Sequence, residues 1–277
     1  MLFRSIRAGA RGVVLFGFAT EFYKLAEAEK RLMLQTAIEA AARRVPVVAS
    51  ITEQSTELAV RKAREMEGLG ADALMVLPPF VLPCGSDGFV RHVKAVAQAV
   101  EIPLVVQYSP QETGVALEPG TLADLMASRN NLRCLKIEAK PPGPVISAVL
   151  AKAARPAPDI FVGYAGLQMI DALARGATGV MPGSSLTDLY CRIHRAYLEG
   201  GLEEARVLHG RLVPFLNFIF QSIEMIVKWE KVILKRRGII ASEYCRYPAY
   251  EPDAIALGLF EAYYAELALC WAEGHGC

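Results

Sequence analysis

The 277-residue chain is 53% hydrophobic, and its 30 Lys and Arg residues nearly balance its 29 Asp and Glu residues. This balance gives no global field that would attract nucleic acid or an anionic membrane surface. The apolar runs are much shorter than the roughly 20 residues that a membrane-spanning helix needs. We therefore expect a cytoplasmic protein that binds neither nucleic acid nor membrane, and whose partners are small molecules or other copies of the chain.

Short runs rich in Val, Ile and Leu recur along the chain and predict seven strands. In chain order they are VVLFG (13–17), PVVAS (46–50), ALMVLPP (73–79), PLVVQY (103–108), CLKIE (134–138), IFVGY (160–164) and GVMPG (179–183). Segments with helical periodicity separate them, such as 27–44 and 57–70. Apolar strands that alternate with amphipathic helices indicate a parallel sheet covered by helices on both faces.

Seven such units are close to the eight of an α/β (β/α)₈ TIM barrel. The chain opens with LFRSIRAGARG, which is typical of the end of a helix that leads into the first of these strands. The barrel's first strand is then missing: either its start has been lost, or another element closes the barrel. From Leu186 onward the pattern is helical only. We predict a barrel over 1–187 that lacks its first strand, followed by a C-terminal helical region over 188–277.

The segment RCLKIE (133–138) places a lysine in the middle of an apolar strand. Chemistry in a barrel lies at the C-terminal ends of the strands, and Lys136 is the lysine at such an end. Burial disfavours the ammonium form and supplies a free amine, which can attack a carbonyl and form a Schiff base. Tyr108, one strand earlier, is expected to lie close enough to transfer a proton. The alternative is a structural lysine that pairs with Glu138 or extends to the barrel rim.

Neither the cysteines nor the histidines form a recognisable metal or redox motif. The six cysteines are scattered without a C-x-x-C pair, and no histidine stands at zinc-ligand spacing. We therefore expect thiols in a reducing compartment, no metal site and no cofactor.

Five segments together carry a family resemblance: GFATEF (17–22), VVQYSPQETG (105–114), CLKIEA (134–139), GATGVMPG (176–183) and RRGIIASEYCRYP (236–248). In this order they resemble the dihydrodipicolinate synthase and N-acetylneuraminate lyase family of class I lyases, which form Schiff bases with 2-oxo acids. The resemblance covers essentially the whole chain. It implies that Lys136 forms the imine, that Tyr108 relays protons, and that the protein is a homo-oligomer, either a tetramer or a dimer.

The same resemblance implies a set of residues that bind the substrate. The loop that holds the substrate carboxylate falls on Gly17, Phe18, Ala19 and Thr20, and Met181 falls at a backbone contact to the 2-oxo acid. Phe18 and Ala19 replace two threonines of the family, so carboxylate binding must rely on backbone N–H groups or Thr20. Two further residues at strand ends, Glu138 and Gly183, complete the predicted set.

The departures from the family pattern bear on the reaction. Glu112 lies near the place of an arginine that grips the second substrate's carboxylate in dihydrodipicolinate synthases, which disfavours that condensation. Phe18, the K-I-E segment and the C-terminal tail resemble the branch that dehydrates 2-keto-3-deoxy sugar acids, such as 2-keto-3-deoxy-L-arabinonate. Retro-aldol cleavage that releases pyruvate is the alternative, because it begins with the same imine. A catalytically inactive binding homologue is the second alternative, suggested by the missing strand and the altered loop.

Overall fold

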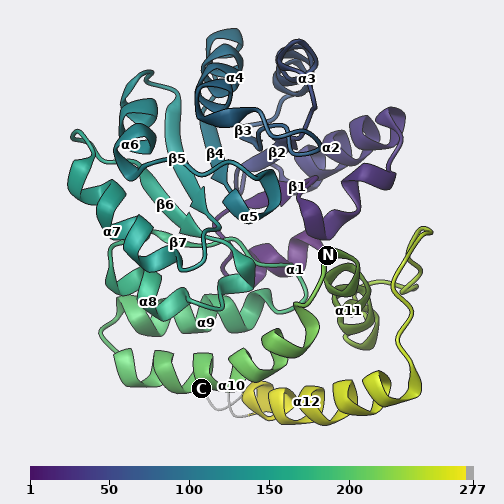
Figure 1. The fold of residues 1–277 in the computed structure, drawn as a ribbon. Coiled ribbons are helices and arrows are strands. Elements are labelled where there is room, and N and C mark those ends of the chain that lie inside the picture. Colours follow the sequence, from purple (N-terminus) through teal and green to yellow (C-terminus); the bar gives the residue numbers. More distant parts are fainter. Residues whose placement is uncertain (273–277) are drawn as a thin grey trace. The chain divides into compact units, whose positions relative to one another are not determined.

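The computed structural model describes residues 1–272, which divide into two compact units (Figure 1). The barrel unit consists of Arg11–Gly17 and Leu25–Met181. The helical unit consists of Met1–Ala10, Phe18–Lys24 and the chain from Pro182 onward. Along residues 1–272, no helix combines the length and the apolar character needed to cross a membrane.

The barrel unit is built on a parallel sheet whose strands are paired in chain order, and Figure 1 shows helices along its outer side. Within the described residues the seven strands are β1 (Val13–Leu15), β2 (Val47–Ile51), β3 (Ala73–Val76), β4 (Leu104–Tyr108), β5 (Leu132–Ile137), β6 (Asp159–Val162) and β7 (Gly179–Val180). This order confirms the predicted fold class: a curled parallel sheet of the (β/α)₈ type that lacks one strand.

Local sequence marks where four of the helices between the strands begin. Ser55 caps its helix by accepting a hydrogen bond from the backbone N–H of Leu58. Prolines occupy the first helical turn of three others, where the missing N–H costs nothing. The helices are α2 (Glu27–Ala41), α3 (Thr56–Gly68), α4 (Gly85–Ala99), α5 (Pro110–Thr113), α6 (Pro119–Ala127), α7 (Pro142–Lys152), η3 (Tyr164–Gly166) and α8 (Met169–Ala174).

One face of the strands packs together in the interior of the barrel unit. Its buried core is Val48, Met75 and Val105, against which Cys134 and Met181 also pack. Side chains along a strand alternate between the two faces of a sheet. A residue two positions from a core member on the same strand therefore faces the interior as well.

The helical unit contains α1 (Leu2–Arg7), η1 (Phe18–Thr20), η2 (Phe22–Lys24), α9 (Thr187–Leu198), α10 (Leu202–Ile219), α11 (Ile223–Arg236) and α12 (Ala254–Ala272). Its core is aromatic: the Trp229 and Phe260 rings stack at 4.5 Å, and Phe215 lies 5.7 Å from Phe260. Burial of such large rings contributes much of the stability of a small helical core.

Candidate active site

Lys136 lies inside the barrel unit, near the carboxyl end of β5. It follows Cys134 by two residues and therefore shares its face of the sheet. In the register of the sheet it stands between Gln107 of β4 and Phe161 of β6. Its side chain is 12% exposed. The strand that carries the lysine is thus placed as the sequence predicts.

The ammonium group of Lys136 forms an ion pair. Its Nζ lies 3.1 Å from Oε1 of Glu138, whose side chain is 10% exposed. The other carboxylate oxygen accepts a hydrogen bond from the amide Nε2 of Gln107. The pairing that the sequence suggested as a structural alternative is therefore present, and it also provides an acceptor for the lysine's proton. We call Gln107, Lys136 and Glu138 the imine site, after the role that the sequence predicts for the lysine.

Gly163 makes room for this carboxylate. A Cβ atom added there would lie 2.1 Å from Cγ of Glu138 and 2.3 Å from its Oε1, which is closer than such atoms can approach. The backbone N–H of Gly163 donates to the carbonyl oxygen of Ile137 at 3.0 Å, so the glycine is fixed by the sheet. Only glycine at this position lets Glu138 occupy its place beside the lysine.

Tyr108 does not face Lys136, so its expected position is wrong. It lies on the outer face of β4, where its ring packs edge-on against Phe89 of α4 at 6.4 Å between centroids. Its hydroxyl donates to the carbonyl oxygen of Leu117 at 3.2 Å and accepts from the N–H of the same residue at 3.1 Å. Neighbouring residues on a strand face opposite ways, so Gln107 takes the interior position.

A second cluster of polar side chains lies after the carboxyl ends of β4, β5 and β6. The hydroxyl of Tyr164 lies 2.9 and 3.0 Å from the two carboxylate oxygens of Glu112 and donates its proton to that group. Ser109 also donates its hydroxyl proton to Glu112. The ammonium of Lys140 lies 4.3 Å from the centroid of the Tyr164 ring, a cation–π contact. We call these four residues the mouth cluster.

The charges of the site act on Tyr164. Burial raises the pKa of its phenol, and the negative charges of Glu112 and Glu138 raise it further. The phenol therefore stays protonated at neutral pH and acts as a hydrogen-bond donor. Glu138 of the imine site thus contributes to the raised pKa of Tyr164, although less than burial and Glu112 do.

Cys134 is the other potential nucleophile on the interior face of β5. Burial raises the pKa of its thiol to about 11, and the nearby carboxylate of Asp159 acts in the same direction. The reactive form of cysteine is the thiolate. Cys134 is therefore an inert packing residue at neutral pH, which leaves Lys136 as the candidate nucleophile of this strand.

The predicted carboxylate-binding residues belong to both units. Gly17 and Met181 follow β1 and β7 in the barrel unit. Phe18, Ala19 and Thr20 form η1 in the helical unit. Their contact with a substrate remains a prediction.

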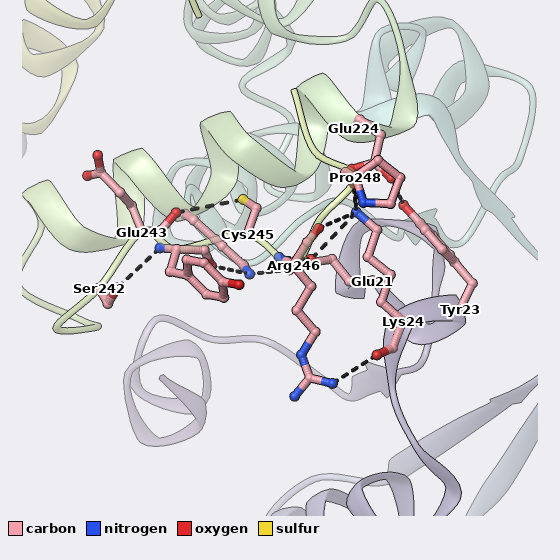
Figure 2. A network of polar contacts seen from close by, with 11 residues as sticks. Glu21, Tyr23, Lys24, Glu224, Ser242, Glu243, Cys245, Arg246 and Pro248 are labelled. Carbon is pink, nitrogen blue, oxygen red and sulfur yellow. Dashed lines mark hydrogen bonds and ion pairs between the residues drawn. The ribbon is translucent and has the colours of Figure 1, made fainter. Parts of the chain in front are cut away.

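A polar network anchors η1 within the helical unit (Figure 2). Glu21, which is 4% exposed, accepts hydrogen bonds from Lys231 of α11 and from the backbone N–H of Arg246 at 2.9 Å. Lys24 donates to Oε2 of Glu224 at 2.7 Å and to the carbonyl oxygens of Arg246 at 2.8 Å and Pro248 at 2.5 Å. This anchor network ties η1 and η2 to α11 and to the C-terminal tail.

Gly183 has a steric role in the helical unit. A Cβ added there would lie 2.3 Å from the carboxyl group of Glu230 on α11. The backbone N–H of Ser185 donates to Oε2 of Glu230 at 3.0 Å. Burial raises the pKa of this carboxyl group, while hydrogen bonds from Ser185 and Ser184 act in the opposite direction. The glycine thus lets a buried acid hold the backbone of the loop after β7.

Sequence reasoning missed Gln107 and Tyr164. β4 is buried along its whole length, so its sequence shows no alternation that would reveal which side chain faces the interior. Tyr164 was visible as a strand-end residue, but its contact with Glu112 joins segments more than 50 residues apart. The signal that the sequence offered was its position directly after a strand.

An interior lysine at the carboxyl end of a strand, in a parallel barrel, is the arrangement of lysine-dependent class I lyases. The chain belongs to the dihydrodipicolinate synthetase family, whose family model matches residues 3–255. The members of this family are class I lyases, and the resemblance found in the sequence is confirmed at that level.

The chain is similar to the following relative and, in fold, to two solved structures. The 4-hydroxy-tetrahydrodipicolinate synthase of Methanopyrus kandleri is 30% identical over 227 residues, which cover 80% of this chain and 74% of the relative. The crystal structure of dihydrodipicolinate synthase from Rhodopseudomonas palustris has a TM-score of 0.88 at 22% identity and covers 96% of this chain and 89% of its own. A prophage protein of the same family from E. coli K12, solved in complex with pyruvate, has a TM-score of 0.87 at 21% identity, with 97% and 91% coverage.

Proposed function

We propose that this protein forms an imine between Lys136 and a 2-oxo acid and dehydrates a 2-keto-3-deoxy sugar acid. The amine attacks the C2 carbonyl carbon, and water leaves to give the protonated imine. The imine acidifies C3, a base removes a C3 proton, and the C4 hydroxyl leaves as water after gaining a proton. Hydrolysis of the imine then releases an oxo acid with an unchanged number of carbon atoms.

The position of Glu138 is the observation that supports this proposal most. Its carboxylate lies 3.1 Å from Nζ of Lys136, so it can take the ammonium proton before attack. C3 of a bound substrate is two bonds from Nζ, within reach of the same carboxylate. Gln107, which cannot exchange a proton, holds the other oxygen and orients the group. We therefore assign the C3 proton transfer to Glu138 rather than to Tyr108.

As part of the same proposal, substrate binding is assigned to Gly17, Phe18, Ala19, Thr20, Met181 and Gly183, with the carboxylate held by backbone N–H groups or Thr20. We further propose that the protein works as a homo-oligomer, a dimer or a tetramer, in a reducing compartment. Light scattering coupled to size exclusion measures the assembly state directly.

The synthase activity named for the Methanopyrus kandleri relative is less well supported here. An aldehyde partner with a carboxylate would meet the negative charge of Glu112 in the mouth cluster. Retro-aldol cleavage shares the imine with dehydration and differs only in the bond that breaks next. The products separate the two reactions: a dehydrated oxo acid in one, pyruvate plus an aldehyde in the other.

The test is borohydride trapping with pyruvate and with 2-keto-3-deoxy-L-arabinonate, followed by intact mass and peptide mapping. We expect a reduced adduct on Lys136 with both compounds, and a dehydrated product from the sugar acid without borohydride. A folded protein that gives no adduct with either compound would overturn the proposal in favour of a binding-only homologue.

A further inference from the structure

We propose that the mouth cluster recognises the hydroxyl-bearing end of the substrate, with Glu112 accepting hydrogen bonds from its distal hydroxyls. Selection for a polyhydroxylated 2-oxo acid, and against one with a second carboxylate, follows from this contact. The inference rests on the imine chemistry proposed above and names the group that sets the substrate class.

The hydrogen-bonding capacity of Glu112 supports this role. Its carboxylate receives protons from Tyr164 and Ser109. An ionised carboxylate offers about four lone-pair positions, so acceptor capacity remains for other hydroxyl donors. Sugar hydroxyls supply such donors, whereas a substrate carboxylate supplies none at neutral pH and carries the same charge.

The mouth cluster lies next to the imine site. Tyr164 directly follows Gly163, whose Cα lies against the side chain of Glu138. The charge of Glu138 also contributes to the raised pKa of Tyr164. A substrate whose C2 is bonded to Lys136 and whose C3 faces Glu138 would extend its remaining carbons toward this cluster.

The backbone at Tyr164 is strained in a way that fits a functional position. Tyr164 and Ala165 have φ values of 47° and 50°, in the left-handed region that side chains disfavour. Such conformations persist where the surroundings fix them, and they concentrate at binding and catalytic sites. Here the strained turn directs the phenol onto Glu112.

Lys140 could set the opposite substrate preference to Glu112, so its contribution must be tested in the same experiment. Its side chain is the positive group of the cluster, and it contacts the face of the Tyr164 ring rather than the carboxylate. If Lys140 rather than Glu112 set the preference, the protein would favour a substrate with a second carboxylate. A dicarboxylic 2-oxo acid therefore has to be among the probes.

The experiment measures the concentration that gives half-maximal borohydride trapping for three probes: pyruvate, 2-keto-3-deoxy-L-arabinonate and 2-oxoglutarate. We expect wild-type protein to prefer the sugar acid over pyruvate and over 2-oxoglutarate. Glu112→Gln should reduce the preference for the sugar acid over pyruvate about 10-fold or more, because it removes charge-assisted hydrogen bonds. Tyr164→Phe should reduce it less. Glu118→Gln removes the same charge from an exposed residue and should keep the wild-type ratio.

The outcomes separate this inference from the proposed function. Trapping of pyruvate by wild-type protein without preference for the sugar acid overturns the inference and leaves the imine chemistry intact. An unchanged ratio in both Glu112→Gln and Tyr164→Phe, with circular dichroism showing folded proteins, overturns it as well. A preference for 2-oxoglutarate that is lost in Lys140→Met assigns the selection to Lys140. No adduct with any probe overturns the proposed function itself.

Discussion

Two lysines with mostly covered side chains lie next to carboxylates in this protein, yet their environments differ. Lys24 of the anchor network is 9% exposed, and Lys136 of the imine site is 12% exposed. Lys24 donates to one carboxylate and to two carbonyl oxygens, which uses all three ammonium protons. In residues 1–272, Lys136 pairs with a single carboxylate. Burial alone therefore does not single out Lys136 as the candidate nucleophile, whereas its remaining hydrogen-bonding capacity does.

The carboxylates show the same contrast. Glu21 is held by Lys231, by Lys24 at 3.8 Å and by a backbone N–H, so its charge is compensated by two cations. Glu138 lies between one cation and the neutral amide of Gln107. A carboxylate with several cationic partners serves structure, because it cannot gain a proton without losing them. One with a single partner can exchange a proton with that partner.

The largest expected effect is the loss of the borohydride adduct when Lys136 is substituted. Lys136→Met should abolish the borohydride adduct, because it removes the amine from the interior face of β5. Lys24→Met should still give the adduct on Lys136 in its folded fraction, since Lys24 contributes contacts rather than a free amine. Intact mass after trapping, with the folded fraction from circular dichroism, measures both. An adduct in Lys136→Met would place the nucleophile elsewhere and end the comparison.

Substitution of Glu21 tests whether the anchor network stabilises the folded protein. Glu21→Gln should lower the free energy of unfolding by about 3 kcal/mol, because the buried carboxylate that pairs with Lys231 and lies near Lys24 is lost. Urea denaturation followed by circular dichroism measures the change. Glu118→Gln, at an exposed position, should stay within about 0.5 kcal/mol of wild type. Equal stability of the two variants would show that the anchor network does not stabilise the fold.

Gly163→Ala tests whether formation of the imine depends on the position of the Glu138 side chain. The added Cβ would overlap the side chain of Glu138, so we expect a loss of about 1–3 kcal/mol in stability together with slower trapping. Gly68→Ala in α3 is the matched control, because an added Cβ meets no described atom within 4 Å there. That control should stabilise the protein by about 0.5–1 kcal/mol. Unchanged trapping in Gly163→Ala would mean that the position of Glu138 is not needed for the imine.

The smallest effect is expected at Asp188, and it depends on pH. Burial acts to raise its pKa, but hydrogen bonds and charge from Arg237, together with the charge of Arg4, lower it below the ordinary value. The folded state then binds the proton more weakly than the unfolded state, whose pKa is about 4. The stabilisation is present above about pH 4 and is lost as pH falls through the lower folded value. Urea midpoints of wild type and Asp188→Asn should therefore converge between pH 6 and pH 2.5; a constant difference would contradict this.

The fold could be predicted from the sequence because its signals are local. Runs such as PVVAS and PLVVQY are apolar on both faces, which is typical of a covered parallel strand, and prolines mark the first turns of three intervening helices. The interior position of Lys136 followed from the same reasoning, because a lysine is rarely buried in such a strand unless its charge is paired or removed.

The arrangement of the site could not be predicted to the same degree. In β4 every residue is buried, so Gln107 and Tyr108 could not be assigned to a face without the register against β5. The contact between Glu112 and Tyr164 depends on how two loops meet in space, which no local pattern encodes. Sequence identified the chemical groups, and the three-dimensional register decided which of them meet.

The close fit between Gly163 and Glu138 also bears on how this family can diverge. Because a Cβ on one residue and the carboxylate of the other compete for the same volume, the two positions cannot change independently. Relatives that keep Glu two residues after the lysine should keep Gly at the end of the next strand, and relatives that lose the acid are free to place Ala or Ser there. Paired substitution at these two alignment columns would thus mark, from sequence alone, the branches in which a carboxylate accompanies the lysine.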